Sequence, residues 1–234
     1  MKNLIVANWK MNPNSQKEAK EIFNAIREGV RGLSAEVVVC PPFVYLAGLK
    51  GLTLGAQNIF YREGGALTSG VSGAMLKDLG VEYATIGHSE SRRYLKETDE
   101  IVNLKTKEAF KYGLKVIFCV GETVEERDAG KKNEVLERQL KIGLAGIENL
   151  ENINIAYEPV WAIGTGNNCS IEETKESIDF IRKFVKPATR ILYGGSVKSE
   201  NSGAYIKDAG ANGLLVGGAS LNPEEFIKII KSID

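Results

Sequence analysis

Eight short apolar runs, separated by segments with helical spacing, constrain the fold of this chain more than any other feature. Most of the runs are almost continuously apolar, which is typical of parallel strands covered on both faces. They lie at residues 4–7, 37–40, 52–56, 83–86, 115–120, 153–157, 190–193 and 213–216.

The segments between these runs carry signals for the start of a helix. Ser15 with Glu18, and Ser170 with Glu173, form capping-box patterns before apolar residues at helical spacing. The pair Asn222-Pro223 is typical of an N-cap followed by proline in the first turn. Eight alternations of strand and helix predict an α/β protein, a single (β/α)8 barrel with eight parallel strands that fills residues 1–234 as one domain. A doubly wound open sheet is the alternative, but such sheets usually have fewer strands.

Composition and charge restrict the partners and the compartment. The 30 Lys and Arg residues balance the 30 Asp and Glu residues, so we expect no general affinity for nucleic acid or membranes, although a local patch stays open. Cys40, Cys119 and Cys169 are far apart and lack CxxC spacing, which favours buried thiols in a reducing compartment over a disulfide framework or zinc cluster. The first residues do not resemble a signal peptide, and no apolar run reaches membrane-spanning length. We therefore expect a cytoplasmic protein.

Ionisable side chains follow three of the apolar runs. Asn8 and Lys10 follow the first, His88 (the only histidine) follows the fourth, and Glu158 follows the sixth. The carboxyl ends of parallel strands meet at one edge, where such folds bind ligands. Each residue also has a simpler interpretation: His88 as a core residue or helix cap, Lys10 as a surface lysine, and Glu158 as half of a salt bridge. Their convergence on one edge favours a site.

Glycine pairs follow the last two runs, in Gly194-Gly195-Ser196 and Gly217-Gly218. One such pair is usually a tight turn, but two pairs after these strands indicate a phosphate site built from backbone amides. After Glu158, an apolar stretch between a proline and a Gly-Thr-Gly sequence suggests a lid that closes over a ligand. The lid residues are Pro159, Val160, Trp161, Ala162, Ile163, Gly164 and Thr165.

These stretches together closely resemble the triosephosphate isomerase family, over essentially the whole chain and in order. The matching segments are 8–12, 87–90, 156–166, 193–197 and 216–220. The resemblance implies a TIM barrel that interconverts dihydroxyacetone phosphate and D-glyceraldehyde 3-phosphate through an enediolate, in glycolysis and gluconeogenesis, with no metal and no cofactor.

The resemblance also implies a role for each site residue. Glu158 would move the proton between the two carbons, while His88, Lys10 and Asn8 would stabilise or position the substrate oxygens. A helix that starts at His88 would keep the imidazole neutral, and this family is itself the standard example of such tuning. Glu90 would have a supporting role, or would simply cap that helix. Gly164, Ser196, Gly217 and Gly218 would bind the phosphate, and Trp161 with Ile163 would shield the intermediate from water.

The loop 65–72 resembles the family's dimer loop, with two departures. Ser91 and Gly70 stand where the family commonly has an arginine and a glutamate that pair at the interface. Losing both partners costs much less than leaving one charge buried. We therefore expect a homodimer in which Thr68 reaches the partner's Lys10 region.

Two alternatives to an isomerase stay open at this stage. One is another barrel enzyme that acts on a phosphorylated metabolite of histidine or tryptophan biosynthesis. The other is a non-catalytic protein that binds phosphometabolites. The first does not explain Lys10, His88 and the lid sequence together. Against the second, no member of the acid–base set is missing.

Overall fold

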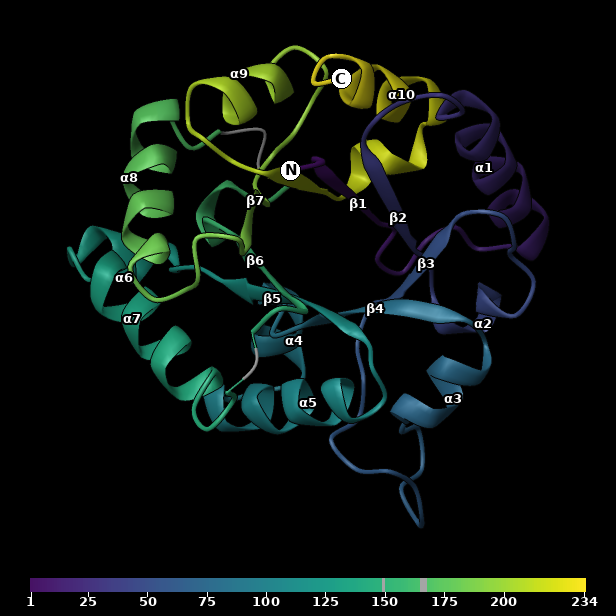
Figure 1. Cartoon of the computed structure of the whole chain (residues 1–234), viewed down its shortest axis with the longest axis horizontal. Coiled ribbons are helices and arrows are strands. Elements are labelled where there is room, and N and C mark those ends of the chain that lie inside the picture. Colours follow the sequence, from purple (N-terminus) through teal and green to yellow (C-terminus); the bar gives the residue numbers. More distant parts are fainter. Residues whose placement is uncertain (149, 165–167) are drawn as a thin grey trace.

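Eight parallel strands close into a barrel in this computed structural model, which describes residues 1–148, 150–164 and 168–234 (Figure 1). Because β1 pairs with both β2 and β8, the sheet has no open edge, which rejects the doubly wound alternative. The strands are β1 (Leu4–Asn8), β2 (Glu36–Cys40), β3 (Thr53–Ala56), β4 (Val81–Ile86), β5 (Lys115–Val120), β6 (Ile153–Tyr157), β7 (Arg190–Tyr193) and β8 (Gly213–Val216).

Helices surround the barrel, and both chain termini lie on the side of α10 (Figure 1). Among the described residues the longer helices are α1 (Gln16–Gly29), α5 (Asp99–Lys111), α7 (Lys132–Gly143), α8 (Ile171–Arg182) and α10 (Pro223–Lys231). The shorter ones are α2 (Phe43–Leu46), α3 (Gly73–Asp78), α4 (Ser89–Tyr94), α6 (Val124–Asp128), α9 (Ser202–Lys207) and the 3₁₀ turns η1 (Val160–Ala162) and η2 (Gly218–Leu221).

Local capping starts several of these helices where the sequence predicts. The Ser15 hydroxyl accepts the backbone N–H of Glu18, and the Ser170 hydroxyl accepts that of Glu173. The Asn222 side chain caps α10, with Pro223 at its first position. At both serine positions only half of the predicted capping box forms, since neither glutamate carboxylate bonds back to the backbone of its cap. The Glu173 carboxylate binds Arg127 instead.

Both faces of the strands are buried, which explains the continuous apolar runs. One face packs on the helices in a large outer core that includes Ile5, Ala7 and Phe118. The opposite face points into the barrel, where the described residues form a cluster of ten buried hydrophobic side chains, among them Leu4, Val6, Cys40 and Cys119. All three cysteines are buried free thiols, as the sequence predicts.

A polar network closes the amino-terminal end of the barrel. Glu36, at the start of β2, accepts hydrogen bonds from the Tyr83 hydroxyl and from Arg190 Nη1, the latter at 2.6 Å. Arg190 also donates to Tyr83 (3.2 Å) and to Asn154 Oδ1 (2.8 Å). The network therefore joins strands β2, β4, β6 and β7 across the barrel.

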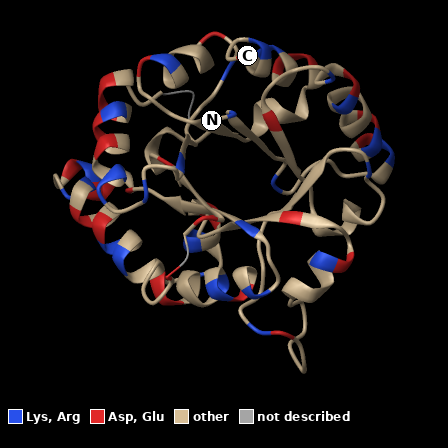
Figure 2. Ribbon diagram, in the orientation of Figure 1, with Lys and Arg blue, Asp and Glu red and all other residues tan. Residues whose placement is uncertain are grey.

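The charged residues lie mainly on the outer helices, where both signs alternate (Figure 2). The equal numbers of positive and negative residues are thus interspersed on these helices (Figure 2). Within the described part of the chain, no helix is long and apolar enough to cross a membrane.

Candidate active site

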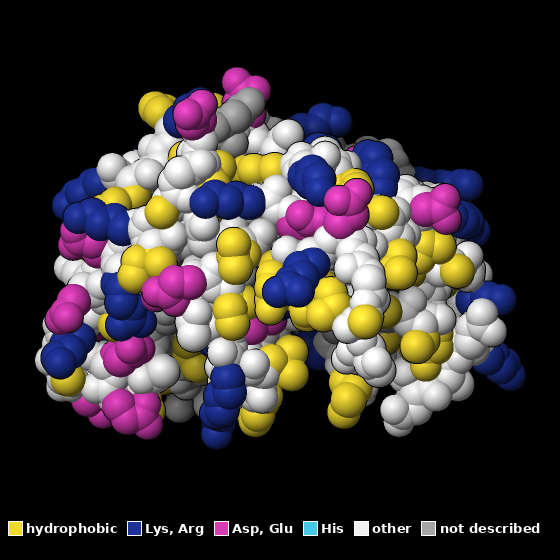
Figure 3. Space-filling model, turned by 90° about the horizontal axis from the view of Figure 1, so that it is seen from below, with side chains coloured by type: hydrophobic (Ala, Val, Ile, Leu, Met, Phe, Trp, Pro, Cys, Tyr) yellow, Lys and Arg dark blue, Asp and Glu magenta, His cyan; other side chains and the backbone are white. Residues whose placement is uncertain are grey.

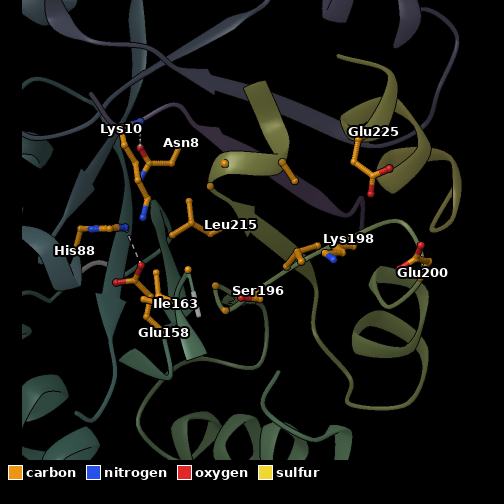
Figure 4. Close-up of a pocket in the computed structure, with 17 residues that line it drawn as sticks. Asn8, Lys10, His88, Glu158, Ile163, Ser196, Lys198, Glu200, Leu215 and Glu225 are labelled. Atoms are coloured by element: carbon orange, nitrogen blue, oxygen red, sulfur yellow. Dashed lines mark hydrogen bonds and ion pairs between the residues drawn. The ribbon is translucent and has the colours of Figure 1, made fainter. Parts of the chain in front are cut away.

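A cavity of about 490 Å³ opens at the carboxyl-terminal end of the barrel (Figure 4). Asn8, Lys10, His88 and Glu158 all line it, so the barrel brings together the four side chains that the sequence placed at three strand ends. The predicted phosphate-binding residues Gly164, Ser196, Gly217 and Gly218 line the same cavity.

Lys10 is held by its backbone in an unusual conformation. Its φ is +54°, in the left-handed region that a lysine rarely adopts, and such strain is common at functional sites. Two hydrogen bonds fix it there: Lys10 N–H donates to Asn8 Oδ1 (3.0 Å), and Gln57 Nε2 donates to the Lys10 carbonyl (2.7 Å). The Lys10 ammonium then reaches Glu90 Oε1 at 2.6 Å. Glu90, in the first turn of α4, is thus the ion-pair partner of Lys10.

His88 is the N-cap of α4, one of the two structural roles that the sequence left open for it. Its Nδ1 accepts the backbone N–H of Glu90 at 3.2 Å, so this nitrogen carries no proton in that bond. Its Nε2 lies 3.0 Å from Glu158 Oε1 (dashed line in Figure 4). This pattern selects the tautomer with the proton on Nε2, aimed toward Glu158 and the cavity.

Charge coupling within this pair opposes the effect of burial. Burial lowers the pKa of His88, but the Glu158 carboxylate outweighs it and raises that pKa above its ordinary value. Burial raises the pKa of Glu158, but the charge and hydrogen bond of His88 lower it overall. The start of α4 favours a neutral His88, as the sequence predicts, but the charge of Glu158 favours the protonated form.

Glu158 is almost fully buried, with 2% of its surface exposed. Its Oε2 accepts the backbone N–H of Ser89 at 3.0 Å. Gly121 makes room for this residue, because a Cβ at position 121 would lie 1.7 Å from the Glu158 carbonyl oxygen. The glycine after β5 is thus required by the path of the chain after β6.

The predicted lid residues lie on two sides of their segment. Ile163 and Gly164 line the same cavity as Glu158, and Ser196 Oγ donates to the Ala162 carbonyl at 2.7 Å. Trp161 points elsewhere, since its Nε1 donates to Glu122 Oε1 at 2.8 Å. Pro159 and Val160 connect Glu158 to these residues, and Thr165 falls outside the described residues.

Several residues of the site are not among the predicted site residues, although Gln57 follows the third apolar run. Gln57 holds Lys10, while Lys198, Glu200 and Glu225 line the outer part of the cavity. The hydrogen bond between the Gln57 side chain and the distant Lys10 carbonyl leaves no local pattern in the sequence, so only the fold reveals it. Among the described residues, no group of three or more His, Cys, Asp or Glu side chains could hold a metal ion.

The chain matches the family model described as triosephosphate isomerase over residues 3–233. It is 45% identical to the triosephosphate isomerase of Alkaliphilus oremlandii, over 98% of each chain. It is 44% identical to that of Aquifex aeolicus, over 99% of this chain and 100% of the relative. It is 45% identical to that of Dictyoglomus thermophilum, over 99% of each.

Proposed function

The chain belongs to the triosephosphate isomerase family, and we propose on this premise how its own residues carry out the reaction. The enzyme interconverts dihydroxyacetone phosphate and D-glyceraldehyde 3-phosphate, a step of glycolysis. The observation that supports the residue roles is one cavity lined by a buried carboxylate, an imidazole, an ammonium group and two glycine-rich strand ends.

Glu158 is the base that removes a proton from the carbon next to the carbonyl and returns it to the neighbouring carbon. In this structure its oxygens accept from His88 and Ser89, which keeps its pKa low. When Glu158 turns from these donors to the substrate, burial becomes the dominant influence and raises its pKa, which makes it a stronger base.

His88 donates a hydrogen bond from Nε2 to the substrate oxygens as the enediolate forms. Once Glu158 has taken the proton, it no longer carries the charge that raises the pKa of His88. The Glu90 N–H bond to Nδ1 then favours the neutral imidazole. Lys10 stabilises the same developing negative charge, and Asn8 positions the oxygens.

The phosphate binds to backbone amides near Gly164, Ser196, Gly217 and Gly218. The absence of a side chain matters at Gly217, because a Cβ there would approach Lys10 Cε to 3.3 Å. The ammonium of Lys10 thus lies close to the phosphate loops and also reaches toward His88 (Figure 4). This arrangement fits a short substrate with one phosphate.

Deuterium exchange separates the base from the hydrogen-bond donor. The wild-type protein with dihydroxyacetone phosphate in D₂O should isomerise it and introduce deuterium at the reacting carbon. Glu158→Gln should lose both signals, whereas His88→Gln should slow both and keep exchange detectable. Binding of 2-phosphoglycolate without any isomerisation by the wild type would instead support a non-catalytic binding protein. Full exchange in Glu158→Gln would make another group the base.

We also propose a homodimer formed at the carboxyl-terminal end of the barrel. Large exposed hydrophobic side chains follow β1, β2 and β4 there, namely Met11, Val44, Tyr94 and Leu95. The loop that carries the exposed Thr68 projects from the barrel between β3 and α3 (Figure 1), and hydrophobic side chains gather beside it in Figure 3. Sedimentation that finds only monomer at micromolar concentration would exclude this dimer. We place the protein in the cytoplasm, where its three thiols stay reduced.

A further inference from the structure

Trp161 anchors the lid segment on the side away from the catalytic cavity. It lines a second cavity of about 310 Å³, together with Glu122, Arg127, Cys169 and other residues. Its Nε1 donates to Glu122 Oε1, which also accepts from the Tyr157 hydroxyl at 3.2 Å. The indole therefore has a defined hydrogen-bond acceptor on a fully buried carboxylate.

Arg127, on α6, covers the face of this indole. Its Cζ lies 3.9 Å from the centre of the Trp161 ring, well within the range of a cation–π contact. The other cation–ring pairs in the described part of the chain are longer, at 4.9–5.8 Å. Arg127 thus makes the closest contact of this kind described here, and it makes it with a lid residue.

Glu173, in the first turn of α8, fixes the direction of the guanidinium. Its Oε1 accepts from Arg127 Nη2 at 2.8 Å, in place of closing the capping box of its own helix. Both side chains are partly exposed, at 38% and 40%, so the ion pair adds little stability in water. Its effect is positional: the bond from Nη2 to Glu173 holds the guanidinium over the Trp161 ring.

The hydrogen-bonded turn η1 (Val160–Ala162) connects Trp161 to Ile163 at the cavity. Ala162 N–H donates to the Pro159 carbonyl at 2.8 Å, and Ile163 N–H donates to the Val160 carbonyl at 3.2 Å. Val160 N–H is itself bonded to the Glu122 carbonyl at 3.1 Å. A shift of Trp161 therefore moves Ile163, which lines the catalytic cavity.

We propose that Arg127 is a positioning residue for the isomerase reaction: by stacking on Trp161 it holds Ile163 and Gly164 over the catalytic cavity. The inference rests on the proposed isomerase function and on the role that the sequence predicts for this segment, as a lid that closes over the substrate and shields the intermediate from water. Arg127 touches no substrate and acts through the indole.

The chemical consequence concerns the fate of the enediolate. If water reaches it, its electrons form the C1 carbonyl and a new C2–C3 double bond while the C3–oxygen bond breaks. That step releases inorganic phosphate and the enol of a three-carbon ketoaldehyde. A loosened lid therefore raises the phosphate lost per isomerisation, which general destabilisation of the fold does not predict.

The test compares Arg127→Ala, Arg127→Lys and Glu173→Gln with the wild type. Lys183→Ala is the matched control, because it removes a cation 5.4 Å from the Phe180 ring on α8, away from the lid. Acrylamide quenching of tryptophan fluorescence reports on Trp161, since the chain has two tryptophans and Trp9 is fully buried. Each variant is measured with and without 2-phosphoglycolate, and inorganic phosphate is counted against isomerisation.

In Arg127→Ala, acrylamide should quench the Trp161 fluorescence more readily than in the wild type. The variant should bind 2-phosphoglycolate roughly two- to fivefold more weakly, as expected for the loss of one cation–π contact. It should also release more inorganic phosphate per isomerisation. Arg127→Lys should recover part of each effect, Glu173→Gln should show a smaller change in the same direction, and Lys183→Ala should match the wild type. If wild-type quenching does not respond to 2-phosphoglycolate, the lid proposal itself fails. If the wild type responds and both Arg127 variants behave like it in all three measurements, the role of Arg127 is overturned.

Discussion

The two ends of the barrel contain similar charged groups in different surroundings. At the amino-terminal end, Glu36 accepts from Tyr83 and Arg190, and Arg190 also binds Asn154. At the carboxyl-terminal end, Glu158 faces His88 and Ser89 beside a cavity with glycine-rich walls. Both carboxyl groups have a lowered pKa despite the opposing effect of burial. A perturbed pKa therefore does not by itself identify a catalytic group; the adjoining cavity distinguishes Glu158.

A Glu→Gln substitution should lower turnover at the carboxyl-terminal end of the barrel and lower stability at the amino-terminal end. Glu158→Gln should lower turnover roughly 10²–10⁴-fold, because it removes the base, and should leave the protein folded. Glu36→Gln should keep turnover and lower the free energy of unfolding by about 1–3 kcal/mol, between the values for exposed and buried ion pairs. A coupled assay and urea unfolding at equal protein concentration measure the two quantities. Near-normal turnover in Glu158→Gln would show that Glu158, like Glu36, is not the catalytic base.

A glycine beside the catalytic carboxylate gives the next largest effect. Gly121→Ala places a Cβ 1.7 Å from the Glu158 carbonyl oxygen, so the backbone that carries the base must move. We expect turnover to fall about 10- to 100-fold, since displacement of a reacting group by about 1 Å is that costly. The matched change Gly203→Ala, where the nearest atom is an ordinary 3.5 Å away, should leave kcat unchanged. Equal kinetics for the two variants would show that the position of Glu158 tolerates this shift.

Acid should weaken the amino-terminal network in a defined range of pH. Burial raises the pKa of Glu36, but hydrogen bonds from Tyr83 and Arg190 lower it overall below the ordinary 4.5. A group with a lowered folded pKa stabilises the protein above its unfolded pKa, and this contribution disappears as pH falls through the folded value. The difference in unfolding free energy between wild type and Glu36→Gln should thus be constant above about pH 5 and narrow toward about pH 3. A difference that stays constant down to about pH 3 would contradict the lowered pKa.

The smallest effect is expected at the outer part of the catalytic cavity. Lys198 is exposed there beside Ser196 (Figure 4), and under the proposed function its charge would attract the substrate phosphate. Lys198→Gln should raise KM about two- to threefold, because one exposed charge contributes at most about 1 kcal/mol in water. The change should shrink with added salt, while kcat should stay constant. Lys207→Gln, on the outer helix α9, is the control, and an equal rise in KM for both would indicate a non-specific charge effect.

The strand bounds show where the local sequence is sufficient to predict a strand and where it is not. The runs at 115–120, 153–157, 190–193 and 213–216 match the observed strands, because a buried parallel strand needs apolar side chains on both faces. Strand β2 starts one residue earlier than predicted, at Glu36, and β4 starts two residues earlier, at Val81. Charged side chains at Glu36 and Glu82 interrupt the apolar pattern, yet both strands begin there: Glu36 pairs with Leu4, and Val81 pairs with Leu54. Arg190 and Lys115 lie close to the two carboxylates.

The sequence by itself determined the strand-and-helix order and which residues follow the carboxyl ends of the strands, because these depend on neighbours along the chain. Only the tertiary structure decided the contacts between distant segments: His88 with Glu158, Lys10 with Gln57, and Trp161 with Arg127. It also turned Trp161 away from the cavity that its sequence position suggested. A side chain's direction and its electrostatic environment depend on barrel closure, which brings these segments within a few ångströms. No local pattern encodes that distance.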